Sequence, residues 1–591
     1  MNIIGISVDS NSTACAVRDG EVLAAISEER FNKIKNYIGY PKKAVEFCVD
    51  KLKGEIDSVV LPSINADPLS ILTHWTSRSV SERMREQNLY WGPKLLDDKD
   101  VHYLDIFPET ADYDQYPGPE FWRQIDFRAP PEERAKCFRH LRKKMVSADL
   151  GVSLSQIELK EHHQCHAYYS YYASPFRGVD VLSFNMDGFG DHWCATLDHF
   201  DKEGVAHSLL ATDQALLGRL YRFTTLNLKM KPLEDEFKVM GLAPYASEYH
   251  WRKPYEVFKE FLTVEGIGFK IKKRPSDFFF YYKEALESCR FDAIAGGLQK
   301  FLEEILVTWV TNAIEETGIS RVVFSGGIAL NVKAMMELTK IPTLTQLFVP
   351  PSGGDESLPI GGAYHKEAST GSSAVIPPLR NAYLGNQYTQ KEIDSFVVRE
   401  KLSKTHHIIE NCSSRQVATL LKEGSVLGVF LGKMEFGARA LGARSIIADP
   451  RSTETVKKIN YKIKSRDFWM PFAPVVLKER FKDYFHDPKN LISPYMSIGF
   501  ETTELGRQAI PAALHPADYT GRPQQLVRED NPPYYDIIKS FEKLTGVGAL
   551  LNTSFNLHGL PIAMSLEDAL HVLENSDLDG VLMESTLVLK K

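Results

Sequence analysis

The sequence has 591 residues, of which 43% are hydrophobic, a share normal for a globular chain. Seven cysteines without a Cys-X-X-Cys pair exclude a small disulfide-stapled module and predict reduced thiols in a cytoplasmic protein. Lysine and arginine total 70 against 77 acidic residues, and the net charge of −7 disfavours a dedicated nucleic-acid-binding protein. We expect no membrane span and no signal peptide, because the sequence has no run of 18 apolar residues and begins like a strand.

Two similar hairpins recur along the chain. Residues 3–8 predict a strand, which enters the polar turn 9–13 and returns. Residues 181–186 predict a second such strand, which enters the turn 187–191 and returns. A strand, a turn with an aspartate and small residues, and a returning strand form the phosphate loop of actin-like ATPases. The repetition indicates an internal duplication whose loops face each other across a nucleotide cleft; two ordinary hairpins are the alternative.

A third part of a nucleotide site is predicted after the short apolar strand 321–324. The segment 325–331 reads Ser-Gly-Gly-Ile-Ala-Leu-Asn and leads into a predicted helix that continues to residue 336. Paired glycines at the end of a strand let a ligand approach the main chain, and the following helix offers its positive N-terminus.

The composition divides the chain into two domains. Residues 367–383 are small and proline-bearing, as in a linker. We therefore predict a first domain over residues 1–366 and a second over 384–591. Within the first, residues 65–150 mix aromatic residues, proline and charge without strand periodicity, and we interpret them as an insertion.

A candidate metal site begins at His162 and His166, which lie four residues apart and share one face of a predicted helix. Such a pair can hold one divalent ion, although an isolated pair is more often a packing feature. The zinc-protease motif His-Glu-X-X-His is excluded, because position 163 is a histidine. Asp355 follows a predicted strand end and a glycine pair, and two histidines with one carboxylate suit Fe(II), Mn or Zn.

Positive charge is concentrated in the second domain, where residues 433–466 hold nine basic and three acidic side chains. Arg439 and Arg444 flank a turn of alanine and glycine, and guanidinium forks bind phosphate or carboxylate oxygens bidentately. Asn552, at the end of a predicted strand, adds an amide donor. We predict a site for a small phosphorylated ligand; a solvated basic face is the alternative.

These ordered stretches resemble the NodU/CmcH-type O-carbamoyltransferases over nearly the whole chain. In the first domain the resemblance is carried by residues 162–167 (His-His-Gln-Cys-His-Ala), 186–190 (Met-Asp-Gly-Phe-Gly), 238–243 (Lys-Val-Met-Gly-Leu-Ala), 325–331 and 348–355. In the second it is carried by residues 437–445 (Gly-Ala-Arg-Ala-Leu-Gly-Ala-Arg-Ser), 471–474 (Pro-Phe-Ala-Pro), 522–524 (Arg-Pro-Gln) and 551–556.

The resemblance implies an α/β protein with an N-terminal actin-like ATPase domain, similar to the tRNA threonylcarbamoyl transferase, and a C-terminal YrdC-like domain. The second domain would bind carbamoyl phosphate and release carbamate and phosphate. An internal passage would carry the unstable carbamate to ATP beside Fe(II) or another divalent ion, with Mg as a further candidate. Carbamoyladenylate and pyrophosphate would form, and the hydroxyl of a small natural-product acceptor, such as an antibiotic, a sugar or an alkaloid, would then displace AMP.

The resemblance also implies a role for each matching residue. The metal ligands would be His162, His166 and Asp355. ATP would lie against Ser10, Ser12, Asp187, Gly188, Gly190, Gly326, Gly327 and Asn331. Carbamoyl phosphate would be bound by Arg439, Arg444, Lys464, Arg466, Arg522 and Asn552, and Lys238 would be catalytic.

Two positions depart from the family pattern. Residues 8–13 read Val-Asp-Ser-Asn-Ser-Thr, without the histidine to which the family assigns deprotonation of the acceptor. Asp9 is the only ionisable residue of this loop, and we hypothesise that it is the base or orients the acceptor. Phe237 stands where relatives have a glycine between Glu236 and Lys238, and its bulk could reshape the acceptor pocket.

The insertion is our candidate for lining that pocket. Tyr90, Trp91, Glu120 and Trp122 could hold a sugar or a cationic alkaloid by stacking, cation–π contact and charge. The alternative is that the insertion is solvated or forms a dimer contact, so homodimer formation remains an open possibility.

Two other functions stay open. A fused two-domain chain could carry out tRNA threonylcarbamoylation, although the net charge and the absence of an RNA-binding tail weigh against this reading. An actin-like scaffold could bind nucleotide without turnover, although such a scaffold has no evident need for a carbamoyl-phosphate site.

Overall fold

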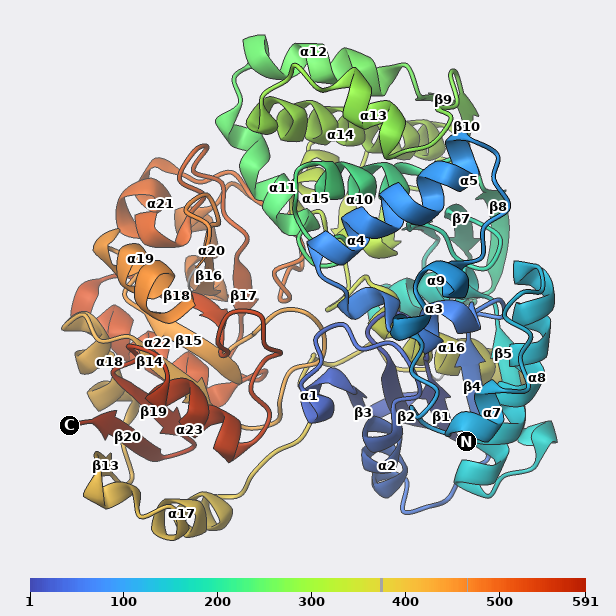
Figure 1. The fold of residues 1–591 in the computed structure, drawn as a ribbon. Coiled ribbons are helices and arrows are strands. Elements are labelled where there is room, and N and C mark those ends of the chain that lie inside the picture. Colours follow the sequence, from blue (N-terminus) through green and yellow to red (C-terminus); the bar gives the residue numbers. More distant parts are fainter. Residues whose placement is uncertain (373–375, 465) are drawn as a thin grey trace. The chain divides into compact units, whose positions relative to one another are not determined.

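The computed structural model describes residues 1–372, 376–464 and 466–591 and divides the chain into two compact units, Met1–Arg380 and Asn381–Lys591 (Figure 1). The division falls within the predicted linker 367–383, of which residues 373–375 lie outside the described residues. Ser465, part of the basic segment 433–466, also lies outside them.

The first sheet of the N-terminal unit starts with the first predicted hairpin. β1 (Asn2–Ile6) pairs antiparallel with β2 (Thr13–Arg18), and β2 pairs antiparallel with β3 (Glu21–Ser27). β4 (Ser58–Pro62) and β5 (Ile157–Lys160) join in parallel on the other side of β1, which gives the order β3-β2-β1-β4-β5. β1 and β4 are almost entirely buried, which explains their nearly continuous apolar sequence.

The second sheet repeats this arrangement strand for strand. β6 (Val181–Met186) pairs antiparallel with β7 (Ala195–Phe200), and β7 pairs antiparallel with β8 (Ala206–Thr212). β11 (Arg321–Ser325) and β12 (Gln346–Phe348) join in parallel, which gives the order β12-β11-β6-β7-β8. The repetition confirms the expected internal duplication and, with it, the actin-like α/β fold class of this domain.

Each half carries a long excursion, which follows the fourth strand in the first half and the third strand in the second half. The predicted insertion 65–150 leaves after β4 and returns before β5, and its main helices are α3 (Pro68–Leu72), α4 (Val80–Glu86), α5 (Gly92–Leu96), α6 (Tyr103–Ile106), α7 (Pro119–Trp122) and α8 (Pro131–Leu150). The excursion between β8 and β11 holds α10 (Leu217–Asn227), α11 (Glu236–Leu242), α12 (Glu248–Lys259), the hairpin β9 (Leu262–Glu265) and β10 (Gly268–Ile271), α13 (Phe280–Ala285) and α14 (Phe291–Thr317).

Two helices that follow the two sheets cross closely. α9 (His162–Ala173) follows β5, and α16 (Leu358–Glu367) follows β12. A Cβ at Gly361 would lie 1.8 Å from the carbonyl oxygen of Cys165, so the crossing requires glycine. The other helices of this unit include α1 (Glu29–Asn32), α2 (Lys42–Lys51) and α15 (Val332–Thr339).

The C-terminal unit is built on one mixed sheet of eight strands in the order β13-β20-β19-β14-β15-β18-β16-β17, an α/β architecture that agrees with the predicted YrdC-like class. Its strands are β13 (His406–Ile409), β14 (Leu427–Phe430), β15 (Arg444–Ala448), β16 (Ala473–Leu477), β17 (Gln524–Leu526), β18 (Ala549–Ser554), β19 (Gly580–Met583) and β20 (Thr586–Lys590). Its helices are α17 (Gln390–Arg399), α18 (Ser414–Lys422), α19 (Glu454–Ile459), α20 (Phe481–Tyr484), α21 (Glu504–Ala509), α22 (Pro532–Thr545) and α23 (Leu566–Glu574).

None of the helices in the described ranges combines the length and the apolar character that a bilayer crossing requires.

Candidate active site

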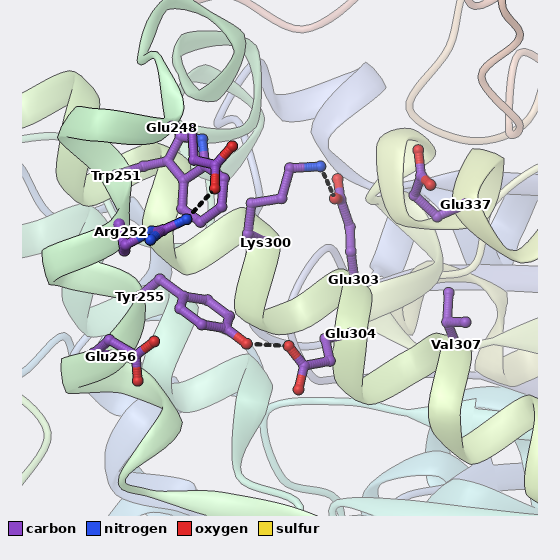
Figure 2. A pocket seen from close by; sticks show the side chains of 10 residues that line it. All are labelled: Glu248, Trp251, Arg252, Tyr255, Glu256, Lys300, Glu303, Glu304, Val307 and Glu337. Atoms are coloured by element: carbon purple, nitrogen blue, oxygen red, sulfur yellow. Dashed lines mark hydrogen bonds and ion pairs between the residues drawn. The ribbon is translucent and has the colours of Figure 1, made fainter.

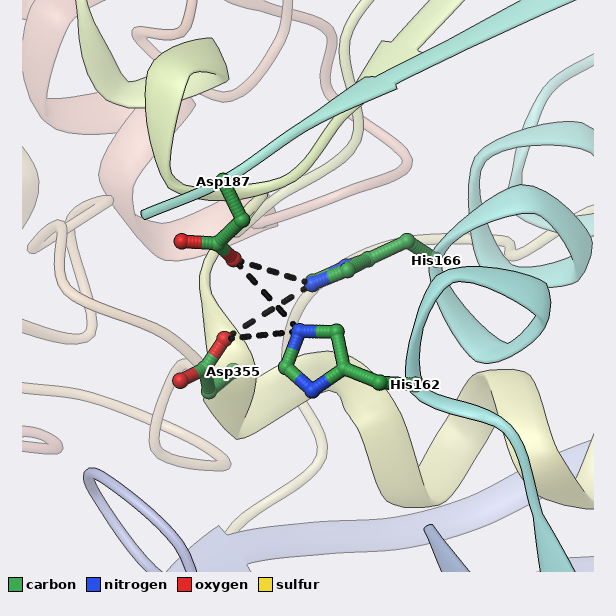
Figure 3. A group of neighbouring side chains, drawn as sticks. All are labelled: His162, His166, Asp187 and Asp355. Atoms are coloured by element: carbon green, nitrogen blue, oxygen red, sulfur yellow. Dashed lines mark ion pairs between the residues drawn. The ribbon is translucent and has the colours of Figure 1, made fainter. Parts of the chain in front are cut away.

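Four side chains converge in the N-terminal unit: His162, His166, Asp187 and Asp355 each offer one ligand atom within 4.8 Å of the others (Figure 3). We call this group the metal cluster. Nε2 of His166 lies 3.3 Å from a carboxylate oxygen of Asp187 and 3.6 Å from one of Asp355. Nε2 of His162 lies 3.6 Å from both carboxylates. Two ligands about 2.1 Å from one ion at a tetrahedral angle are about 3.4 Å apart, so these spacings fit a single divalent ion.

The fold supplies the cluster from the ends of three elements. His162 and His166 lie one turn apart at the start of α9. Asp187 directly follows β6, and Asp355 begins the turn that leads into α16. The close crossing of α9 and α16 therefore brings together residues that are almost two hundred positions apart in the sequence.

Two serine hydroxyls orient the imidazole rings. Ser63 Oγ lies 3.1 Å from Nδ1 of His162, and Ser325 Oγ lies 3.3 Å from Nδ1 of His166. Each ring therefore turns its Nε2 toward the carboxylates. Both Nε2 atoms and Oδ1 of Asp355 are buried without a hydrogen-bond partner among the described residues. Buried polar atoms that converge without partners are typical of a site for an ion.

The members of the cluster shift one another's pKa. Burial acts to lower the pKa of His162, but the neighbouring carboxylates of Asp187 and Asp355 raise it to about 10. Burial raises the pKa of Asp355, and the Asp187 carboxylate raises it further. Burial acts to raise the pKa of Asp187 as well, but the two histidines hold it well below its usual range. The carboxylates therefore favour positive charge at the centre, which a divalent ion supplies.

The donor set of two imidazoles and two carboxylates suits Fe(II), Mn or Zn. The sequence predicts three of these ligands and places Asp187 only along the ATP phosphates. In the structure Asp187 joins His162, His166 and Asp355 as a further candidate ligand, which the predicted set did not include. The sequence signal for Asp187 is its position at the end of a buried strand, where polar side chains of a parallel sheet gather.

The loops after β6 and β11 approach each other at the cluster. The Asp187 carboxylate accepts hydrogen bonds from the N–H of Gly188 at 2.6 Å and of Gly327 at 3.2 Å. Gly326 has a φ of 86°, and a Cβ there would lie 2.3 Å from the carbonyl oxygen of Met186. Glycine therefore permits this contact between two loops of the second half.

Asp191, which the sequence analysis missed, ties the second loop to the first sheet. Its carboxylate accepts hydrogen bonds from the N–H groups of His162 at 2.9 Å, Ile64 at 2.8 Å and Asn65 at 2.6 Å. The neighbouring Gly190 packs against α9, since a Cβ there would lie 2.8 Å from the His162 ring. Asp191 belongs to the predicted turn 187–191, but its partners lie far away in the sequence.

Asp9 lies in the first loop, within electrostatic reach of the metal cluster. Burial raises its pKa to about 6, against the lowering effects of a hydrogen bond from Ser63 and of the Arg142 charge, and the Asp355 charge raises it as well. Oδ2 of Asp9 is buried without a hydrogen-bond partner in the described part of the chain. A carboxylate with this pKa is ionised at neutral pH and can accept a proton.

Three other residues predicted for the N-terminal site have different surroundings. The Ser12 hydroxyl donates to the main chain of its own loop at 2.9 Å and accepts from the N–H of Gly39 at 3.0 Å, whereas Ser10 is partly exposed. Lys238 lies on α11 with its Nζ 3.1 Å from the Asp235 carboxylate. The roles predicted for these residues stay predictions.

Asn331, expected near the adenosine, is held by a buried amide. Its Nδ2 donates to Gln299 Oε1 at 2.9 Å, and its Oδ1 accepts from Gln299 Nε2 at 3.0 Å. Gln299 also donates to Glu303 at 3.0 Å. Glu303 lines a pocket of about 450 Å³ between α12, α14 and α15 (Figure 2). A polar chain thus leads from Asn331 to a pocket whose wall also includes Trp251 and Lys300.

Three of the predicted arginines of the C-terminal unit form what we call the arginine cluster. Burial, followed by the charge of Arg439, lowers the pKa of Arg466 to about 10. Burial likewise lowers the pKa of Arg522, and the charges of Arg439 and Arg466 lower it further. All three side chains are half-buried, and guanidinium groups that repel one another are stabilised by a bound anion. Arg439, Arg466 and Arg522 therefore suit a phosphorylated ligand.

The other three residues predicted to bind carbamoyl phosphate hold loops in place. Arg444 is fully buried and donates to several carbonyl oxygens, among them that of Gly432 at 3.3 Å. Lys464 donates to the carbonyl oxygen of Asn556 at 2.8 Å, and Asn552 donates to a main-chain carbonyl oxygen at 2.9 Å. Their contact with carbamoyl phosphate stays a prediction.

The residues proposed for the acceptor pocket divide into two pairs. Trp122 is 2% exposed and Tyr90 packs edge-on against Tyr103, so both belong to the interior of the insertion. Trp91 and Glu120 are exposed. The prediction for the first pair overlooked that large aromatic rings commonly fill a small core.

Comparison with known proteins relates both units to carbamoyl transfer. Residues 2–364 match the family described as Carbamoyltransferase N-terminus, and residues 418–590 match Carbamoyltransferase C-terminus. Nodulation protein NolNO of Sinorhizobium fredii is 28% identical over 600 residues, covering 98% of this chain and 79% of that protein. An uncharacterized protein of Methanocaldococcus jannaschii is 32% identical over 74% of each chain.

Among solved structures, full-length HypF in its phosphate- and nucleotide-bound form is similar over 63% of this chain and 56% of its own, with a TM-score of 0.35 and 10% identity. The activator of the 2-hydroxyisocaproyl-CoA dehydratase from Clostridium difficile covers 63% of this chain and 97% of its own, with a TM-score of 0.29 and 13% identity. The two family matches together span the metal cluster and the arginine cluster, and on them the chain belongs to the carbamoyltransferase family.

Proposed function

We propose that the chain is an ATP-dependent O-carbamoyltransferase that acts on a hydroxyl of a small natural-product acceptor. Water splits carbamoyl phosphate into carbamate and phosphate. A carbamate oxygen then attacks the α-phosphorus of ATP, and pyrophosphate leaves, so that carbamoyladenylate forms. Finally the acceptor oxygen attacks the carbamoyl carbon, the bond from that carbon to the phosphate oxygen breaks, and AMP leaves.

The observation that carries the proposal is the metal cluster, where the loops after β6 and β11 meet and to which Asp9 of the first loop is electrostatically coupled. His162, His166, Asp187 and Asp355 would hold a divalent ion, which when bound polarises phosphate oxygens and neutralises developing charge. The glycines of the two loops leave room for phosphate oxygens to approach the main chain beside it.

Asp9 is the proposed acceptor of the hydroxyl proton. Its pKa of about 6, raised chiefly by burial, keeps it ionised at neutral pH while bringing its basicity closer to that of an efficient general base. The proton leaves the acceptor oxygen as that oxygen bonds to the carbamoyl carbon.

The arginine cluster supports the first step. Arg439, Arg466 and Arg522 would bind the phosphate group of carbamoyl phosphate and stabilise the charge that it gains as it leaves. Lowered guanidinium pKa values in the free chain mean that a bound dianion relieves repulsion among the three cations.

Exchange of labelled pyrophosphate into ATP tests the proposal without an acceptor. The full chain is incubated with ATP, Fe(II) or another divalent ion, labelled pyrophosphate, and carbamoyl phosphate. We expect labelled ATP only when carbamoyl phosphate is present, because formation of carbamoyladenylate is reversible. Pyrophosphate exchange that does not depend on carbamoyl phosphate would contradict the proposal. Absence of exchange with every divalent ion tested would also contradict it, and would favour a nucleotide-binding scaffold.

A further inference from the structure

A second electropositive site lies in the N-terminal unit, where the insertion meets α10. Its centre is Trp75, which begins the short turn Trp75–Ser77 after α3. The Arg83 guanidinium lies 3.8 Å from the centroid of the Trp75 ring, and the Arg222 guanidinium lies 4.0 Å from it. Arg83 comes from α4 and Arg222 from α10, two helices that lie side by side (Figure 1).

A single buried carboxylate serves two guanidinium groups here. Glu86, which is 3% exposed, accepts hydrogen bonds from Arg83 Nη1 at 3.2 Å, from the Tyr103 hydroxyl at 2.6 Å and from Arg78. Arg78 also donates to the carbonyl oxygen of Thr73 at 2.9 Å, so its donors are used. Glu86 therefore offsets only part of the positive charge around it.

Arg83 keeps unused donors in a buried position. Its side chain is 3% exposed, and its Nε and Nη2 have no hydrogen-bond partner within the described ranges. Burial and the charges of Arg222 and Arg78 lower the pKa of Arg83 well below its usual range. Burial and the charge of Arg219 lower the pKa of Arg222 to about 10 in spite of nearby carboxylates. Guanidinium donors in such a place gain from an anion that reaches them.

The site adjoins the second phosphate loop. α10 begins so close to this loop that a Cβ at Gly218 would lie 2.7 Å from the main-chain nitrogen of Gly188. Arg219 then places its guanidinium 4.6 Å from the centroid of the Phe189 ring. Arg222 follows about one helical turn, or roughly 5 Å, further along α10. A ligand bound at Arg222 thus lies beside the proposed carbamoyl-transfer centre.

We propose that Trp75, Arg83 and Arg222 bind an oxyanion group of the acceptor, whether a carboxylate, a sulfate or a phosphate, while its hydroxyl faces the carbamoyl group. The inference rests on the proposed function and names the acceptor's chemical class. We favour the acceptor over ATP as the ligand of this site, because Trp75 and Arg83 belong to the insertion. The phosphates of ATP are expected at the glycine-bearing loops after β6 and β11 instead. Planar guanidinium forks suit such oxygens better than an ammonium group does.

Calorimetric titration with sulfate as the probe tests the site without turnover. The full chain is first saturated with phosphonoacetamide, in which a methylene group replaces the labile oxygen of carbamoyl phosphate, and with α,β-methylene-ATP. These unreactive analogues fill the other two anion sites, and sulfate is added at constant ionic strength. We expect one sulfate per chain and a Kd at least about tenfold higher for Arg222→Gln. The matched control Arg252→Gln removes an exposed guanidinium paired with Glu248 and should leave the Kd within about twofold.

Arg222→Lys keeps the charge without the fork and should give an intermediate Kd, and thermal unfolding checks that each variant is folded. No sulfate binding to the saturated chain, or an unchanged Kd in folded Arg222→Gln, would overturn the inference. Sulfate binding that disappears when the ATP analogue is present would assign the arginines to the nucleotide and would also overturn it. Failure of pyrophosphate exchange, by contrast, would contradict the proposed function in a separate assay.

Discussion

The Ser63 hydroxyl lies 3.1 Å from Nδ1 of His162, so the segment that follows β4 orients a ligand of the metal cluster on α9. Ser63 has a left-handed backbone conformation with φ of 61°, which costs about 1–2 kcal/mol in a residue with a Cβ. The Arg142 guanidinium supports this conformation by donating to the Ser63 carbonyl oxygen at 2.8 Å. A buried arginine of the insertion, a strained serine and an imidazole therefore form one chain of contacts.

Ser63→Ala is expected to weaken metal binding, because the His162 ring loses the partner that fixes its orientation. Loss of such an outer contact typically costs about 10–100-fold in metal affinity. Titration of the metal-free chain with Co(II), followed by its absorption bands, measures the change. Ser369→Ala, at an exposed serine, is the matched control. Equal Co(II) affinities in the two variants would show that Ser63 does not orient His162 for metal binding.

Arg142→Gln is expected to destabilise the N-terminal unit. Arg142 is fully buried and donates to the carbonyl oxygens of Pro62 at 3.4 Å and Ser63 at 2.8 Å, and its charge stabilises the ionised form of Asp9. Removing a buried charged partner costs about 3 kcal/mol or more, which urea unfolding would measure. Arg142→Lys should not restore stability, because one ammonium group cannot reproduce the fork.

Lys136→Gln, an exposed change on the same helix α8, should alter the free energy of unfolding by less than about 0.5 kcal/mol. If Arg142→Gln were as stable as this control, the buried guanidinium would not support the loop.

Local sequence patterns predicted the parts of the fold that depend on neighbouring residues. The apolar runs and polar turns after positions 3 and 181 identified both hairpins and their duplication, because strand and turn preferences act over a few residues. The spacing of His162 and His166 placed both rings on one helical face for the same reason.

Contacts between distant segments could not be predicted from such patterns. Nothing local to Asp187 shows that its carboxylate meets α9, and nothing local to Arg142 shows that it reaches Ser63. Arg444 and Lys464 are predicted from the sequence to bind carbamoyl phosphate, and the structure engages both with main-chain oxygens. Which charges bind the main chain and which face a ligand depends on tertiary packing.

Gly361→Ala tests the crossing of α9 and α16. Alanine favours a helix over glycine by about 1 kcal/mol, so propensity alone predicts stabilisation. A Cβ at this position would lie 1.8 Å from the Cys165 carbonyl oxygen, which forces the helices apart and costs at least about 1–3 kcal/mol. We expect a lower unfolding midpoint and weaker Co(II) binding. Gly268→Ala, whose Cβ would have its nearest neighbour 3.6 Å away, is the control, and a stabilised Gly361→Ala would exclude the close crossing.

Metal binding is expected to release protons. In the ion-free chain the pKa of His162, lowered by burial but raised by Asp187 and Asp355, is about 10, so the ring is protonated at pH 7. This charge stabilises the ion-free fold below pH of about 6.5, and the contribution is lost as the pH rises toward 10. A ligand imidazole must be neutral, so the apparent metal affinity should rise about tenfold per pH unit for each proton released. Calorimetry in buffers of different ionisation enthalpy would detect the protons, and a pH-independent affinity would refute this expectation.

The central claim is that the arginine cluster splits carbamoyl phosphate and the metal cluster activates the carbamate on ATP. The most direct test compares phosphate release with carbamoyl-phosphate-dependent pyrophosphate exchange in His166→Ala and Arg466→Gln. The account predicts that His166→Ala loses exchange by about 100-fold or more but keeps phosphate release within a few-fold, whereas Arg466→Gln loses both. Loss of both reactions in His166→Ala, or full exchange in Arg466→Gln, would contradict it.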